Sequence, residues 1–136
     1  MGLKERRAIT DFQTAKYPEL EKAILDAAAM PVEIEVDWDS LAIEGSSHLY
    51  AECIPAIYFA PLTGALKSIT ADAMGAEALK SALKKIIIQN KGGVAAAAKV
   101  ATFTGGVLTL DHKPTTNVGQ AKERETAIRN LLENAL

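Results

Sequence analysis

Four acidic side chains alternate with apolar ones over residues 32–39, and this spacing could gather carboxylates on one surface. The acidic residues are Glu33, Glu35, Asp37 and Asp39, and the apolar residues between them are Val32, Ile34, Val36 and Trp38. Successive side chains of a strand point to opposite faces, so the pattern predicts a half-buried strand with the apolar row inward. The acidic row could bind a divalent cation or a basic protein, because hard cations prefer oxygen ligands.

Strand geometry favours the protein partner over the cation. Alternate residues of a strand lie roughly 6.5–7 Å apart, so a compact metal cage would need ligands from other elements. We expect a solvated face with cross-strand pairs to lysines, and we treat Glu33, Glu35, Asp37 and Asp39 as a candidate interaction surface for a basic partner. No spacing of metal ligands, phosphate-loop glycines or nucleophiles predicts a metal or a cofactor.

The pair Asp111-His112 is the other place where the residue types could support catalysis. Histidine is the side chain best suited to move protons near neutral pH. Neighbouring residues on a strand point to opposite faces, however, so these two cannot act together on one substrate atom. A pocket beside His112, Asp111 and Trp38 would suit a small hydrolase or ligand-binding enzyme, which is our alternative functional hypothesis.

Composition excludes several classes of protein. The chain has 136 residues, 49% of them hydrophobic, and a net charge of −2, which is typical of one folded domain and unlike a general nucleic-acid binder. Cys53 is the single cysteine, so no intramolecular disulfide can form and a reducing compartment is expected. The charged N-terminal residues lack the apolar run of a secretory signal. We therefore expect a cytosolic protein.

Helical spacing of apolar residues predicts helices over 3–16 and 18–29, separated at Pro18. No charged residue occurs between Glu52 and Lys67, which indicates a core helix from Leu49 to Ile69. A membrane span needs about 20 apolar residues, and this run is shorter and interrupted by prolines, so we expect a kinked helix and no membrane association. A capping signal at 70–72 predicts a further helix that ends near residue 84.

The remaining elements are three strands and a last helix. The run Ile86-Ile87-Ile88 predicts a central strand covered on both faces. Gly105-Gly106 lies between two strand-like segments and predicts a tight hairpin in which Phe103 faces Leu108 and Ala101 faces Leu110. Asn117, followed three residues later by Gln120, resembles a capping box at the start of the final helix.

Together these patterns predict a single globular α+β domain over 1–136. Its sheet has about four mostly antiparallel strands packed against several helices, in the order α-α-β-α-α-β-β-β-α. The apolar helix and the run of isoleucines leave more apolar surface than one small domain can cover. We therefore expect a non-enzymatic protein-interaction domain that forms a homodimer through this helix or the outer face of the sheet, with no nucleic-acid partner.

Overall fold

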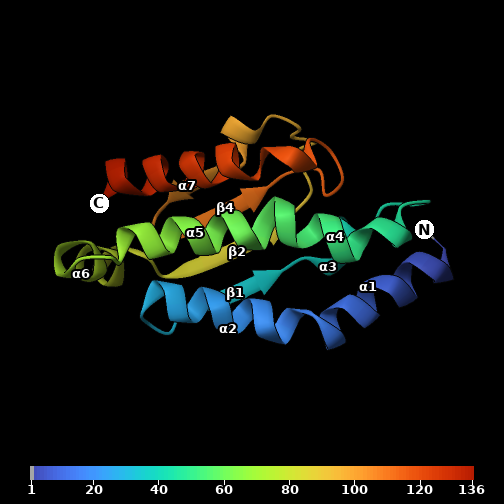
Figure 1. The fold of residues 1–136 in the computed structure, drawn as a ribbon, viewed down its shortest axis with the longest axis horizontal. Coiled ribbons are helices and arrows are strands. Elements are labelled where there is room, and N and C mark those ends of the chain that lie inside the picture. The colour runs from blue at the N-terminus through green and yellow to red at the C-terminus, as the bar shows by residue number, and fades with distance from the viewer. Residues whose placement is uncertain (1) are drawn as a thin grey trace.

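The computed structural model describes residues 2–136 and has an α+β fold. A layer of helices packs on one side of a four-stranded mixed sheet, and Figure 1 shows α2, α5 and α7 side by side in front of the strands. The helices are α1 (Leu3–Ala15), α2 (Tyr17–Ala28), α3 (Trp38–Leu41), α4 (Tyr50–Ile54), α5 (Ala60–Ile69), α6 (Ala73–Ala82) and α7 (Ala121–Ala135). The strands are β1 (Glu33–Val36), β2 (Lys85–Gln89), β3 (Ala101–Thr104) and β4 (Val107–Asp111).

The sheet has the strand order β1-β2-β4-β3. β1 is parallel to β2 and β2 is parallel to β4, whereas only β3 and β4 are antiparallel. The predicted class and strand number are confirmed, but the prediction of a mostly antiparallel sheet is wrong. The chain passes through α3, α4, α5 and α6 between β1 and β2, and such a crossover can return the next strand in the same direction.

The predicted hairpin is confirmed in its turn and its register. Gly105 and Gly106 have φ values of 59° and 82°, the positive values that a two-residue hairpin turn requires and that glycine adopts without strain. Phe103 pairs with Leu108 and Ala101 pairs with Leu110, as their spacing from the turn predicts.

The sheet is covered on its inner face only. Ile86, Ile88, Leu108 and Leu110 point inward and are fully buried against the helices. The central position of β2 is confirmed, but the prediction that β2 is covered on both faces is wrong, since Ile87 is only half-buried. We define the outer sheet face by the residues that point away from the helices: Glu33, Glu35, Lys85, Ile87, Gln89, Thr102, Thr104, Val107, Thr109 and Asp111.

The first strand is shorter than the alternating pattern predicts. β1 ends at Val36 because Asp37 caps α3, its carboxylate accepting a hydrogen bond from the Ser40 backbone N–H at 3.3 Å. Trp38 is thus the first residue of α3 and does not complete the inward row of β1, which corrects that prediction. The alternation itself holds within β1, where Glu33 and Glu35 are exposed and Ile34 and Val36 are half-buried.

The predicted kinked core helix is confirmed. α4 continues through a π-helical segment, η2 (Pro55–Phe59), into α5, and Ile54, Ile57 and Leu62 are fully buried. The stretch Ser47–Ile69 is long and apolar enough to cross a membrane, with a mean hydropathy of 1.2. In the fold it lies between α2 and α7, as Figure 1 shows, and more than half of its apolar stretch is buried. Its apolar surface is therefore used within the chain.

The start of the last helix also differs from the prediction. Asn117 has a left-handed backbone conformation (φ 55°) and makes no capping hydrogen bond with its side chain, which instead donates to the Ala95 carbonyl. A 3-10 turn, η4 (Val118–Gln120), follows, and α7 begins at Ala121. The asparagine therefore fixes a loop rather than a helix cap.

Gly75 permits the tight junction of α5 and α6. A Cβ atom at this position would lie 1.8 Å from the Ile69 carbonyl oxygen, which belongs to the backbone and cannot rotate away. We expect Gly75→Ala to lower the free energy of unfolding by about 1–3 kcal/mol despite the better helix propensity of alanine. Urea unfolding measures this loss. Gly119→Ala is the matched control, because no atom lies within 4 Å of its Cβ position, and equal stability of the two variants would contradict the prediction.

Candidate functional site

The acidic residues predicted to form one row lie on two elements, Glu33 and Glu35 on β1 and Asp37 and Asp39 at the start of α3. Lys85 Nζ lies 3.0 Å from a Glu33 carboxylate oxygen and 3.6 Å from one of Glu35. Lys91 Nζ lies 3.1 Å from a carboxylate oxygen of Asp37, while Asp39 lies in the first turn of α3. Within residues 2–136 no group of three or more His, Cys, Asp or Glu side chains could hold a metal ion. The lysines balance much of the charge that a basic partner would recognise.

The structure places Asp111, His112 and Trp38 in three different environments. The Asp111 carboxylate accepts hydrogen bonds from the backbone N–H groups of Lys91 and Gly92, each at 3.0 Å, and so fixes the loop after β2. Trp38 packs against aromatic rings of α1 and α2. His112 is completely buried on the other side of the strand from Asp111. The three side chains thus form separate structural contacts.

His112, Tyr58 and Arg124 are polar side chains inside the protein, and we call these three residues the buried polar cluster. The Tyr58 hydroxyl donates a hydrogen bond to the His112 carbonyl. Arg124 is fully buried, and its guanidinium donates to the carbonyls of Asn117 (2.9 Å), Val118 (3.0 Å) and Ala56 (3.4 Å). The guanidinium therefore joins the loop before α7 to the π-helical segment.

A proline explains why the Ala56 carbonyl needs this donor. The five-residue spacing of a π-helix would pair that carbonyl with the backbone nitrogen of Pro61, which carries no hydrogen. The N–H of Ala60, which an α-helix would supply, donates to the Pro55 carbonyl instead. Arg124 replaces the missing helical donor, since buried carbonyls without partners are costly.

The electrostatics of the buried polar cluster are those of a structural element. Burial lowers the pKa of Arg124, but an arginine keeps its charge in proteins, and no carboxylate among the described residues forms an ion pair with it. Burial also lowers the pKa of His112, an effect that the hydrogen bond to the Lys113 carbonyl opposes and the Arg124 charge reinforces. The Nδ1 atom donates to that carbonyl at 2.7 Å, which places one proton on Nδ1, and the lowered pKa keeps the ring neutral at pH 7.

The buried neutral histidine makes stability depend on pH. An unfolded histidine has a pKa of about 6.5 and the folded one a lower pKa, so the unfolded state binds more protons as the pH falls below that value. The contribution of the neutral His112 ring to the free energy of unfolding is complete above pH ~6.5. It is lost as the pH falls toward the pKa of the folded state, by at most about 1.4 kcal/mol per pH unit. We expect His112→Gln to flatten the loss of unfolding free energy between pH 7 and pH 5.

Urea titrations at pH 7, 6 and 5 measure this slope. His48→Gln is the control, because it removes an exposed histidine that lies outside the buried polar cluster. A slope that is the same in all three proteins would contradict the assignment of a buried neutral ring to His112.

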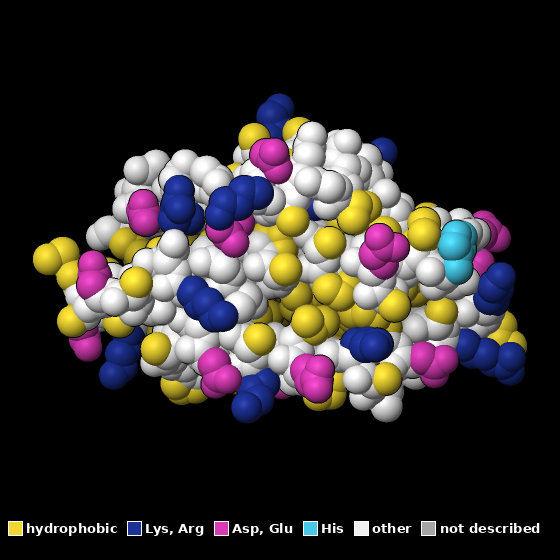
Figure 2. Space-filling view, in the orientation of Figure 1, with side chains coloured by type: hydrophobic (Ala, Val, Ile, Leu, Met, Phe, Trp, Pro, Cys, Tyr) yellow, Lys and Arg dark blue, Asp and Glu magenta, His cyan; other side chains and the backbone are white. Residues whose placement is uncertain are grey.

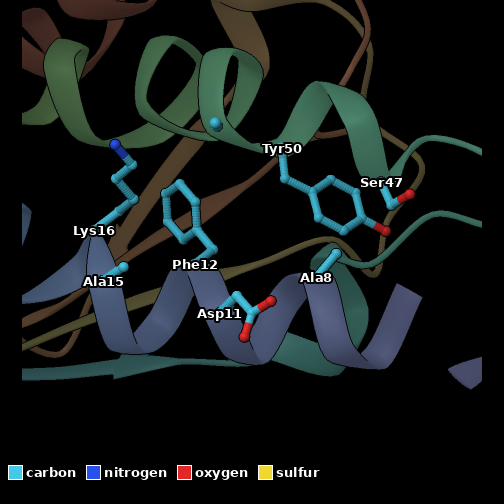
Figure 3. A pocket seen from close by; sticks show the side chains of 8 residues that line it. Ala8, Asp11, Phe12, Ala15, Lys16, Ser47 and Tyr50 are labelled. Carbon is cyan, nitrogen blue, oxygen red and sulfur yellow. The ribbon is translucent and has the colours of Figure 1, made fainter. Parts of the chain in front are cut away.

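The hollows on the surface lie between helices and away from the sheet. Figure 2 shows apolar side chains at the floor of a depression between α1–α2 and α4–α5. One part, of about 290 Å³, lies between α1 and α4, where Phe12 and Tyr50 approach from opposite sides and Asp11, Lys16 and Ser47 stand at the rim (Figure 3). The Tyr50 hydroxyl already bonds the backbone of Ile43. The polar groups that this cavity presents to a ligand are therefore those of Asp11, Lys16 and Ser47 at its rim.

A neighbouring hollow brings together Asp11, Ser47 and His48, which the sequence analysis did not connect. They line an open depression of about 500 Å³ between α1 and the turn η1 (Ser47–Leu49). No hydrogen bond joins these side chains in the part of the chain that the structure describes. A nucleophile needs a base within hydrogen-bonding distance, and the structure shows no such contact among these three side chains.

No family model matches the sequence, no curated protein resembles it, and no solved structure matches the fold. The chemistry of the chain has to be judged from its own geometry.

Proposed function

We propose that this chain is a small cytosolic protein-interaction domain, without enzymatic activity, that works as a homodimer through its sheet. One observation carries the proposal, namely a mostly parallel sheet with helices on one side only. Parallel strands are normally covered on both faces. Here Ile87 and Val107 are half-buried on the outer sheet face, so the sheet is the side of the domain that the helices leave free to meet a partner.

The long apolar helix is the less suitable surface. Its apolar side chains Ile57, Leu62 and Leu66 are completely buried inside the domain, so they cannot contact a partner. The sequence leaves this helix and the sheet as alternative interfaces, and the packing of α5 against α2 and α7 favours the sheet.

A second copy suits this surface better than a basic protein. Lys85 pairs with both Glu33 and Glu35, so its single positive charge offsets part of the negative charge that a basic protein would recognise at this end of the outer sheet face. The β3 side of the outer sheet face carries the neutral side chains of Thr102, Thr104 and Thr109, which a second copy can meet without charge repulsion, and two-fold dimers are the commonest closed oligomers.

The oligomeric state tests the proposal. Size-exclusion chromatography coupled to light scattering, at micromolar protein and moderate salt, is expected to give twice the chain mass. Sedimentation equilibrium over a range of concentrations checks that the species is a closed dimer rather than a growing aggregate. A monomer that persists on concentrating would contradict the proposal.

A further inference from the structure

The sheet ends in two edge strands, β1 and β3, and their chemistry differs. Edge strands expose unpaired backbone groups that can pair with another chain, and proteins usually protect them with charges, prolines or bulges. At β1 the exposed residues Glu33 and Glu35 place like charges along the edge. Two copies of β1 would therefore repel each other.

β3 lacks these protective features. No charged residue occurs from Val100 to Leu110, and the exposed side chains of β3 are those of Thr102 and Thr104. The strand has no proline and pairs with β4 without a bulge. Its edge is therefore open to pairing in a way that the β1 edge is not.

The backbone of β3 offers a self-complementary set of donors and acceptors. The Asp111 N–H donates to the Val100 carbonyl at 2.8 Å, which marks a hydrogen-bonded pair of the antiparallel ladder. Such pairs alternate, so Thr102 and Thr104 direct their backbone groups toward β4, whereas Ala101 and Phe103 direct theirs outward. Those outward groups have no hydrogen-bond partner within residues 2–136.

We propose that two copies pair through antiparallel β3 strands, which joins the two sheets into one of eight strands. This inference rests on the proposed homodimer and names its interface. A two-fold axis beside Thr102 pairs Ala101 of each copy with Phe103 of the other, and all four outward groups of each copy then find partners. The two Thr102 side chains face each other directly across the axis, a favourable cross-strand pair.

Charges at position 102 test this geometry. Thr102→Glu places two carboxylates opposite each other and is expected to raise the dimer dissociation constant roughly tenfold or more. Thr102→Lys should do the same. An equimolar mixture of these two variants should recover the dimer, because opposite charges then meet at the axis, and native mass spectrometry would identify the heterodimer.

Thr109→Glu is the matched control. Thr109 pairs with Thr102 across the hairpin and lies on the outer sheet face, but it is one strand away from the edge. Edge pairing predicts that this variant remains a dimer, and circular dichroism checks that all variants are folded. Hydrogen exchange adds an independent readout, since the Ala101 and Phe103 amides should be protected in the wild type and exchange faster in Thr102→Glu.

The outcomes separate this inference from the proposed function. Dissociation in both position-102 variants, recovery in their mixture and an intact Thr109→Glu dimer would support pairing through β3. A dimer that survives Thr102→Glu but is lost in Thr109→Glu would overturn it in favour of face-to-face packing, and the proposed homodimer would stand. A wild-type monomer at every concentration would overturn both.

Discussion

Replacing Arg124 with methionine is expected to lower the free energy of unfolding by roughly 3–5 kcal/mol. The methionine fills much of the same volume, so the loss comes from hydrogen bonds. Arg124 has no accessible surface, and it donates to the carbonyls of Asn117, Val118 and Ala56. After the substitution these three carbonyls remain in place but have lost their hydrogen-bond donor, which is destabilising. Part of this loss is offset because the charged guanidinium no longer has to be desolvated.

Two further variants separate charge from geometry. Arg124→Lys keeps the positive charge but not the planar fork that reaches several carbonyls, so it should recover only part of the stability. Arg129→Met is the control on the same helix, because Arg129 is only half-buried and makes no side-chain hydrogen bond or ion pair within residues 2–136. Chemical denaturation followed by circular dichroism measures all three. A loss below about 1 kcal/mol in Arg124→Met would contradict the role assigned to the guanidinium.

The sequence contains evidence that Arg124 is buried, but the charged residues on either side of it suggest the opposite. Arg124, Ile128 and Leu132 are four residues apart and share the buried face of α7. Helical periodicity thus places the arginine among core residues, whereas its position between Glu123 and Glu125 suggests a solvated surface. Apolar patterns identify the residues that are buried for hydrophobic reasons. They miss a buried cation whose partners are backbone carbonyls, because those carbonyls depend on the tertiary arrangement.

The predictions that succeeded depended on local rules. The Gly105-Gly106 turn fixes the register of β3 and β4 within a few residues, and Pro18 separates α1 from α2 by its own geometry. The direction of β1 relative to β2 is not local, since it depends on the route of the chain through the four intervening helices α3 to α6. An alternating pattern shows which face of a strand is buried. It does not show which strand lies beside it, nor whether helices cover one face of the sheet or both.

The end of β1 shows a local rule that competes with periodicity. The apolar and acidic alternation continues through Asp39, but Asp37 also fits the capping position of a helix. Ser40, three residues later, donates its backbone N–H to the Asp37 carboxylate and its hydroxyl to the Asp37 carbonyl. The cap ends the strand and turns Trp38 toward α1 and α2. A search for capping residues inside an apparent strand could have detected this change.

Trp38→Ala is expected to lower the free energy of unfolding by roughly 2–4 kcal/mol, because the half-buried indole loses contacts on two helices at once. Its ring lies 5.0 Å from that of Tyr17 in an edge-to-face arrangement and 5.9 Å from that of Phe12. Tyr17 in turn packs against Phe59 of the long core helix, 5.8 Å away. The indole therefore links α3 to the helical layer, although Trp38 lies outside β1.

Fluorescence and denaturation test this arrangement together. Trp38 is the single tryptophan, so its emission in the native protein should lie at shorter wavelength than in urea. Trp38→Phe should restore about half of the stability lost in Trp38→Ala, since an aromatic ring can still contact Tyr17 and Phe12. Circular dichroism follows unfolding in the variants that lack the indole. Native emission at the fully solvated wavelength, or equal stability of wild type and Trp38→Ala, would contradict the packing, because an indole that packs between two rings is neither solvated nor dispensable.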